Sequence, residues 1–267
     1  MSGQKKQDGN NVQKNDLKQY WFVIRQMASR EIKRGNASKR LGQMWNILMP
    51  FVSMMIMAIL FAFVFEKNLR EFMPFVYTGT IVYELYNSGM GSCLHALSGN
   101  KNLLVRTKIP PNVFVVEKIY VAIIHLLFSL VGYVVILIIS GTLVGPTVAL
   151  APIGIIFSVF VIMGIGKILA VINVYFADIN YFYKVIMRLM FYGSGIFFEV
   201  ERVSPAMAAF MEYNPIYLAV HFERQCILYN QIPDPMVWVR LGLYAIGLYI
   251  IGTLIFMKGS QDVVAKV

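Results

Sequence analysis

Charge is scarce in this sequence, and the scarcity excludes an ordinary water-soluble domain. Only 14% of the 267 residues are charged and 58% are hydrophobic, and the mean hydropathy is +0.62. Soluble domains carry about 25% charged residues. A membrane-spanning helix needs roughly 20 mostly apolar residues to cross about 30 Å of hydrocarbon, and such runs recur along the chain. The composition therefore predicts an all-α integral membrane protein.

Catalytic and redox motifs are also missing. The three histidines lack the spacing of metal ligands or of a catalytic triad. We expect the two cysteines, Cys93 and Cys226, to lie near opposite faces of the membrane, too far apart for a disulfide. The sequence contains no G-x-x-x-x-G-K-S/T phosphate loop, so an ATPase that drives this protein must be another polypeptide. We predict no catalytic residues and no metal site.

Basic residues gather ahead of the first apolar run. Residues 1–43 contain ten Lys and Arg against three acidic residues. The positive-inside rule places such a segment in the cytoplasm, where it also contacts anionic lipid headgroups, so the basic charge needs no nucleic-acid partner. We expect a flexible cytoplasmic tail over residues 1–15. An amphipathic helix is predicted over 16–43, either lying along the membrane interface or packed on a partner protein.

Six apolar runs predict six transmembrane helices within a domain over residues 44–257. A basic inner connection around Arg106 contrasts with an outer connection, 142–150, that carries no charge. Both termini are then cytoplasmic, with a C-terminal tail over 258–267. Four prolines in 200–235 predict short helices between the fifth and sixth spans that re-enter the membrane or lie on its outer surface. The predicted spans are 44–66, 73–98, 113–141, 149–176, 181–199 and 236–257.

Polar and small residues follow one face of the second predicted span at intervals of three or four residues. Unpaired polar groups in hydrocarbon are costly, so this face should pack on neighbouring helices or line a water-filled path. Packing explains Thr80 and Gly91 at least as well as a pathway does, whereas Glu84 favours a functional or pairing role, with Lys167 as its candidate partner. The face consists of Tyr77, Thr80, Glu84, Asn87, Gly91, His95 and Ser98.

Two cations stand four residues apart near the start of the fifth predicted span. Lys184 and Arg188 therefore share one helical face. They either attract an anionic lipid headgroup or snorkel to the inner interface as anchors.

Four stretches resemble, in the same order, motifs of the ABC-2-type permeases that export polysaccharides, O-antigen and teichoic acids. They cover REIK, RLG, Trp45 and Pro50 within 30–50, LLVRTKIP at 103–110, FADINY at 176–181 and YNPIY at 213–217. Three positions depart from the family pattern. Ala177 stands where arginine is usual, Gly195 stands where proline is common, and residues 34–36 blur a basic motif.

The resemblance implies a homodimeric permease bound to two ABC ATPase subunits that hold ATP and Mg²⁺, in a bacterial cytoplasmic membrane. Its cargo would be a polysaccharide or teichoic acid on an undecaprenyl-diphosphate anchor. Two alternatives stay open: an exporter of a drug, peptide or simple lipid on the same frame, and a membrane enzyme or scaffold that works without ATP.

The resemblance also implies roles for individual residues. The ATPase would contact a coupling helix formed by Leu103, Leu104, Val105, Arg106, Thr107 and Lys108. Lys184 and Arg188 would bind the lipid diphosphate, for which cations are a direct match. Together with the polar face, aromatic side chains suited to sliding sugars would line the channel between the two copies. The lining set is Tyr77, Thr80, Tyr83, Glu84, Tyr86, Asn87, Phe191, Tyr192, Phe197 and Phe198.

Overall fold

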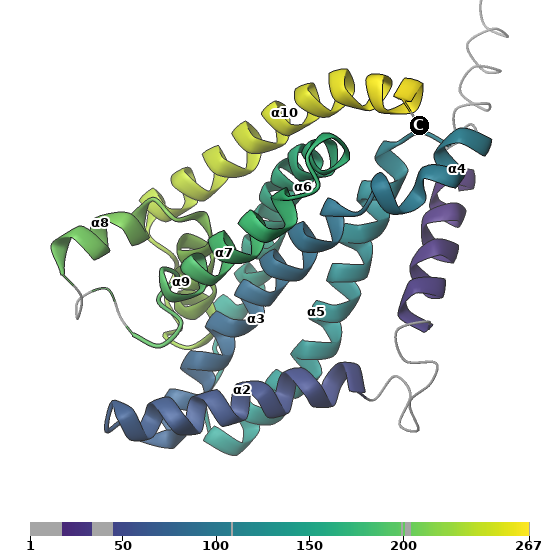
Figure 1. Ribbon diagram of the computed structural model, residues 1–267. Coiled ribbons are helices and arrows are strands. Elements are labelled where there is room, and N and C mark those ends of the chain that lie inside the picture. The colour runs from purple at the N-terminus through teal and green to yellow at the C-terminus, as the bar shows by residue number, and fades with distance from the viewer. Residues whose placement is uncertain (1–17, 34–44, 108, 199, 201–203, 267) are drawn as a thin grey trace, which may run out of the picture.

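The computed structural model describes residues 18–33, 45–107, 109–198, 200 and 204–266, which form helices and no strand. A helix over residues 18–33, here called the N-terminal helix, precedes the labelled elements (Figure 1). The predicted tail over 1–15 and both ends of the predicted 16–43 helix, 16–17 and 34–43, lie outside the described residues. The labelled helices are α2 Trp45–Val64, α3 Leu69–Leu94, η2 Ser98–Asn100, α4 Lys101–Arg106, α5 Asn112–Ser140, η3 Pro146–Leu150, α6 Ala151–Tyr175, α7 Ile179–Tyr192, α8 Pro205–Glu212, α9 Pro215–Ile227 and α10 Pro235–Lys266.

Helix α3 is the centre of the bundle. It packs against α2, α5, α6, α7 and α9, and most of its side chains are buried. Its start is fixed by Asn68, whose side chain accepts a hydrogen bond from the Arg70 amide at 3.1 Å and thereby satisfies one of the free N–H groups of the first turn. These five helices are therefore positioned by their contacts with α3.

The long apolar runs form helices close to their predicted boundaries, except that α10 continues to Lys266 through most of the predicted C-terminal tail over 258–267. Three of them are long and apolar enough to cross a membrane: Asn112–Ser140, Pro146–Tyr175 and Pro235–Ser260. Helix α2 has a shorter apolar part, Leu48–Val64, and α3 carries the polar face. Helix α5 ends at Ser140 and is capped by Gly141, whose φ of 71° is the left-handed conformation that glycine adopts freely.

The prediction of one helix over 181–199 is wrong. Helix α7 has 14 residues and ends at Tyr192; at 1.5 Å per residue it is about 21 Å long, shorter than the roughly 30 Å of hydrocarbon. The chain then turns through a buried segment, 193–197, in which Gly195 has a φ of 62°. Beyond it, prolines begin α8, α9 and α10, at the helix position where the missing N–H costs least.

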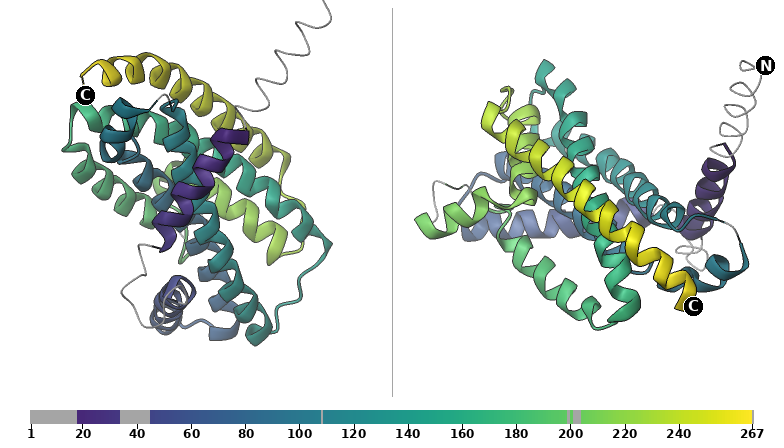
Figure 2. Two further views of the ribbon diagram at one scale, coloured as in Figure 1. Left: turned by 90° about the vertical axis from the view of Figure 1, so that its right-hand side faces the viewer. Right: turned by 90° about the horizontal axis from the view of Figure 1, so that it is seen from above.

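Two glycines allow α6 and α10 to touch backbone to backbone. A Cβ atom added at Gly252 would lie 2.1 Å from the carbonyl oxygen of Gly164, and one added at Gly164 would lie 2.4 Å from the Leu248 carbonyl. Small residues at a helix crossing allow such close approach in membrane proteins. Figure 2 shows α10 running along the bundle while the N-terminal helix lies on its outside.

Candidate functional site

The predicted coupling segment forms a short helix between α3 and α5. Helix α4 has six residues. It buries Leu104 against the bundle and leaves Leu103, Val105 and Arg106 exposed. The Thr107 hydroxyl donates to the Leu103 carbonyl at 2.6 Å and so closes the last turn. Lys108 lies outside the described residues. One anchored side and one exposed side suit a helix that docks on another protein.

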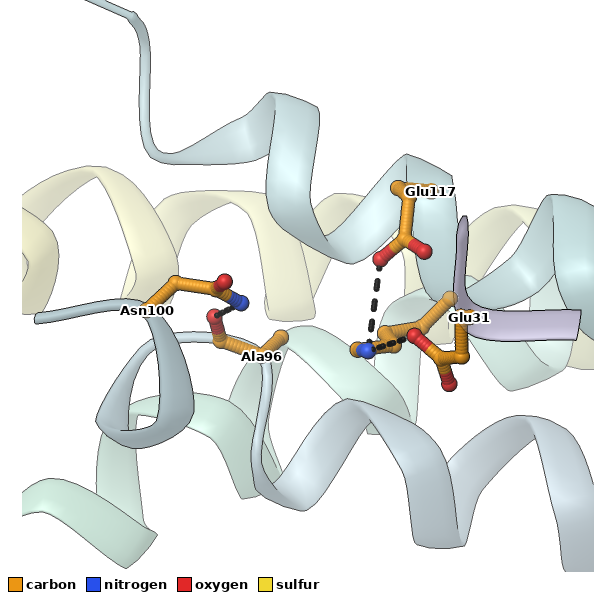
Figure 3. Close-up of polar contacts among 5 residues, drawn as sticks. Glu31, Ala96, Asn100 and Glu117 are labelled. Carbon is orange, nitrogen blue, oxygen red and sulfur yellow. Dashed lines mark hydrogen bonds and ion pairs between the residues drawn. The ribbon is translucent and has the colours of Figure 1, made fainter. Parts of the chain in front are cut away.

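An ionic junction next to this end joins the N-terminal helix to α5 (Figure 3). The Lys118 ammonium contacts the carboxylate of Glu31 and lies 3.4 Å from that of Glu117. The Glu117 side chain is only 1% exposed, so the ammonium compensates a carboxylate removed from water. Trp21 packs edge-on against Tyr120 with ring centroids 5.3 Å apart.

The sequence did not reveal this junction as a site. Glu31 and Lys118 are separated by 87 positions, and nothing in the local pattern pairs them. An acid within the predicted amphipathic helix and a lysine near the start of the third predicted span were the only available signals. The nearby Asn100 side chain donates to the Ala96 carbonyl at 2.9 Å and stabilises the turn that leads into α4 (Figure 3).

The predicted channel-lining residues on α3 separate into three groups. Tyr77 and Tyr86 are 1% and 0% exposed, and Tyr77 stacks on Tyr133 of α5 with centroids 5.5 Å apart. Their placement inside one chain supports packing rather than contact with cargo. The Tyr83 hydroxyl donates to the Met187 carbonyl of α7 at 2.8 Å. By contrast, Glu84 is exposed.

The polar face of α3 meets α7. Tyr183 of α7 donates its hydroxyl hydrogen to the Asn87 carbonyl at 2.6 Å, and its ring lies over Gly91, where an added Cβ would come within 3.2 Å of it. Thr80 is half-buried and donates to the Val76 carbonyl of its own helix at 2.6 Å. Packing therefore accounts for a large part of the face.

Lys184 and Arg188 are both exposed on α7. Among the described residues of α7, only Met187 is classed as fully buried, so this helix leaves most of its circumference uncovered by its own chain. Within the described part of the chain, neither cation lies within 4 Å of a carboxylate. The pair is therefore available to an anionic group from outside the chain.

Aromatic rings connect α2 to the segment after α7. Phe61 of α2 stacks on Phe197 with centroids 3.9 Å apart. Phe197 also contacts Phe191 at 5.4 Å, and Phe191 contacts Tyr83 at 4.9 Å. Tyr192 is exposed and Phe198 is half-buried. The first and fifth predicted spans are neighbours through these rings.

The suggested pairing of Lys167 with Glu84 is wrong. The buried Lys167 ammonium donates to the Thr253 hydroxyl at 3.0 Å and lies 4.4 Å from the centre of the Tyr249 ring. Both partners belong to α10. Lys167 thus strengthens the α6–α10 contact by a hydrogen bond and a cation–π interaction.

Comparison with known proteins identifies the family. Residues 23–228 match the family model described as ABC-2 type transporter. The O-antigen export system permease protein RfbA of Myxococcus xanthus is 22% identical over 92% of this chain and 96% of its own length. RfbA of Klebsiella pneumoniae is 22% identical over 71% of this chain and 74% of its own length. The polysialic acid transport protein KpsM of Escherichia coli is 21% identical over 87% of this chain and 91% of its own length.

The family match spans the N-terminal helix from residue 23, the coupling segment and the bundle as far as the end of α9. Together with the apolar helices, it identifies an integral membrane protein. The chain belongs to the ABC-2 type transporter family.

Proposed function

We propose that this chain is the membrane-spanning permease subunit of an ATP-driven exporter whose cargo is a polysaccharide or teichoic acid on an undecaprenyl-diphosphate anchor. The main support is that relatives named as O-antigen and polysialic acid export proteins align over most of the chain. The membrane is the bacterial cytoplasmic membrane. The chain moves its cargo and performs no chemistry on it.

The proposed topology has six crossings with both termini in the cytoplasm. The crossings are made by α2, α3, α5, η3 with α6, α7 with the turn that follows it, and α10. Basic residues support this orientation, because Lys101 and Arg106 of α4 lie at the same end of the bundle as the junction of Lys118 with the N-terminal helix. Helices α8 and α9 then form the re-entrant region on the outer side.

Two copies of the chain would associate with two ABC ATPase subunits, which bind ATP and Mg²⁺. The exposed Leu103, Val105 and Arg106 of α4 provide apolar contacts and one charge for that docking. Leu104, buried beneath them, joins α4 to the hydrophobic core, so a displacement of α4 would be passed to the bundle. The ionic junction holds the N-terminal helix against the start of α5, so the two helices would move together.

The cargo path runs along the uncovered side of α7. Lys184 and Arg188 would bind the lipid diphosphate, because two cations on one helical face match a group with several anionic oxygens. Glu84 and Tyr192 are exposed and Asn87 is half-buried, and a second copy of the chain would close the channel over them. Tyr77 and Tyr86 would serve as packing residues beneath it.

Co-purification with the ATPase tests the coupling assignment. We expect Arg106→Glu to reduce ATPase co-purification severalfold, because it reverses the charge on the exposed side of α4. The matched control is Arg70→Glu at the opposite end of α3, which should leave co-purification unchanged. Full retention of the ATPase by Arg106→Glu, with export intact, would remove α4 as the docking element.

The diphosphate assignment has a separate test. We expect the double variant Lys184→Gln and Arg188→Gln to retain the ATPase but to accumulate undelivered lipid-linked polymer inside the cell. The matched control is Arg240→Gln, on a cation of α10 that pairs with Glu212. Normal amounts of surface polymer in the double variant would contradict a role in binding the diphosphate.

A further inference from the structure

A cavity of about 600 Å³ opens where α2 turns into α3. This volume falls within the roughly 300–1,000 Å³ of small-molecule sites. Half of its lining residues are aromatic. The lining consists of Phe65, Lys67, Asn68, Glu71, Phe72, Pro74, Phe75, Thr142, Phe197, Phe198, Leu228 and Tyr229. We call it the aromatic pocket.

The aromatic pocket and the coupling helix lie at opposite ends of α3. The pocket uses the first turns of α3, whereas α4 follows its last turn, in the opposite corner of Figure 1. With 26 residues, α3 is about 39 Å long at 1.5 Å per residue. If α4 faces the cytoplasm, as proposed above, the pocket opens on the outer side of the membrane.

The walls of the pocket are held in place from behind. Phe72 and Phe75 lie nearly parallel, with centroids 6.0 Å apart, and Phe65 meets Phe72 edge-on at 6.3 Å. The Arg224 guanidinium covers the other side of Phe75 at 3.4 Å from the ring centre. Arg224 also donates to the Phe75 carbonyl at 3.0 Å and to the Gly195 carbonyl at 2.7 Å. The rings therefore form a preorganised surface rather than a loose apolar patch.

Among the residues that the structure describes, the rim of the pocket is polar and has no net charge. Lys67 and Glu71 line it with opposite charges, and the adjacent Glu66 and Arg70 also cancel. All four side chains are exposed, and within the described residues none of them forms an ion pair within 4 Å. Lys67 supplies donors, Glu71 supplies acceptors, and Asn68 has a side chain of both kinds. A balanced rim gives no preference for an anionic lipid or an acidic sugar.

We propose that the aromatic pocket binds a short neutral saccharide, one or two pyranose rings of the polymer, on the outer side of the membrane. The C–H faces of a pyranose pack on aromatic rings, while its hydroxyl groups need the donors and acceptors that the rim provides. A pocket that binds a sugar unit after the polymer has crossed the membrane hinders the polymer from sliding back. This assignment rests on the proposed export function, and it places one such pocket in each chain.

Saturation-transfer NMR on the purified full chain in nanodiscs tests the proposal. The probes are neutral disaccharides, their uronic-acid counterparts and a polyprenyl phosphate. We expect signal from neutral disaccharides, and binding about tenfold weaker in Phe65→Ala, which loses a stacking surface. The matched control is Phe63→Ala, because Phe63 is 78% exposed two residues earlier and does not line the pocket. Lys67→Met combined with Glu71→Gln should weaken binding similarly while leaving the rim neutral.

Three outcomes would overturn the proposal: no signal from any neutral disaccharide, equal loss in Phe65→Ala and Phe63→Ala, or binding of polyprenyl phosphate alone that depends on Phe65. Because this measurement needs no ATPase, it separates the pocket from the export function. Saccharide binding by a chain that never associates with an ATPase would refute the export function and leave the pocket standing. ATPase association without saccharide binding would do the reverse.

Discussion

The two ends of α3 are built from different interactions. At one end, α4 and the N-terminal helix are held by Leu104, by the Glu31–Lys118 contact and by the ring contact of Trp21 with Tyr120. At the other end, Arg224 joins α9 to α3 and to the turn after α7 through hydrogen bonds to the Phe75, Gly195 and Ile196 carbonyls. The first end is adaptable and charged, whereas the second is preorganised and aromatic.

This difference fits two different tasks. A helix of six residues such as α4 is marginal by itself, so its position depends on what docks on it. A pocket that recognises a ligand gains affinity when its walls are fixed before binding. The comparison therefore suggests that an ATPase moves the coupling end while the pocket end keeps its shape.

We expect the largest loss of stability from a substitution of Arg224 at the pocket end of α3. Arg224→Met leaves three backbone carbonyls without their guanidinium donor, and we expect a loss of about 3–5 kcal/mol in the free energy of unfolding, because each buried acceptor left unsatisfied costs about 1–3 kcal/mol. Thermal unfolding in detergent measures it. The matched control is Arg240→Met, which removes an exposed pair with Glu212 at 3.2 Å and should cost about 0–1 kcal/mol. Equal losses in the two variants would show that Arg224 does not anchor this end.

The next largest loss of stability is expected at the close contact between α6 and α10. Gly252→Ala forces α10 away from α6, because the added Cβ would lie 2.1 Å from the Gly164 carbonyl oxygen. We expect about 1–3 kcal/mol of destabilisation, read from the unfolding temperature. Gly247→Ala on the same helix meets no atom within 4 Å and should be neutral. A stable Gly252→Ala variant would contradict the close backbone contact.

A smaller loss of stability is expected at the middle of α3, where Tyr83 contacts α7. Tyr83→Phe removes only the hydroxyl that donates to the Met187 carbonyl at 2.8 Å. We expect a loss of about 0.5–1.5 kcal/mol and faster amide exchange in α7. Tyr192→Phe is the control on an exposed tyrosine. Unchanged exchange in α7 would mean that other contacts hold that helix on α3.

We expect the smallest loss of stability from a substitution of Glu31 at the coupling end of α3. Glu31→Gln weakens the contact with Lys118, and since the Glu31 side chain is 39% exposed we expect about 0.2–1 kcal/mol. Amide exchange over residues 18–33 should nevertheless accelerate, and ATPase co-purification should fall while saccharide binding is kept. Glu212→Gln serves as the control. Unaltered exchange over 18–33 would show that the junction does not hold the N-terminal helix.

Sequence patterns predicted the helices well where a long apolar run determines them. The runs that became α5, α6 and α10 needed only length and hydropathy, and prolines marked the starts of α8 and α9. The end of α7 was missed, because Gly193 and Gly195 interrupt a run whose hydropathy continues. Hydropathy does not distinguish a helix from a buried turn.

The candidate sites were harder to predict, because they depend on residues distant in sequence. Spacing placed Tyr77 on a face of α3 but not against Tyr133 of α5. Depth alone suggested Glu84 as the partner of Lys167, whereas the observed partner, Thr253, lies 86 positions away. The aromatic pocket combines four stretches that are separate in sequence: 65–75, 142, 197–198 and 228–229. Only their arrangement in three dimensions reveals it.

ATP-dependent polymer transfer in proteoliposomes is the most direct test of the proposed export function. The chain would be reconstituted with its ABC ATPase and a lipid-linked polysaccharide, and polymer that reaches the opposite side would be measured. We expect transfer that requires both ATP and the ATPase, that is lost in Arg106→Glu and that persists in Arg240→Met. Transfer by this chain without any ATPase, or ATP-driven transport of small lipids or drugs but no polymer, would contradict it.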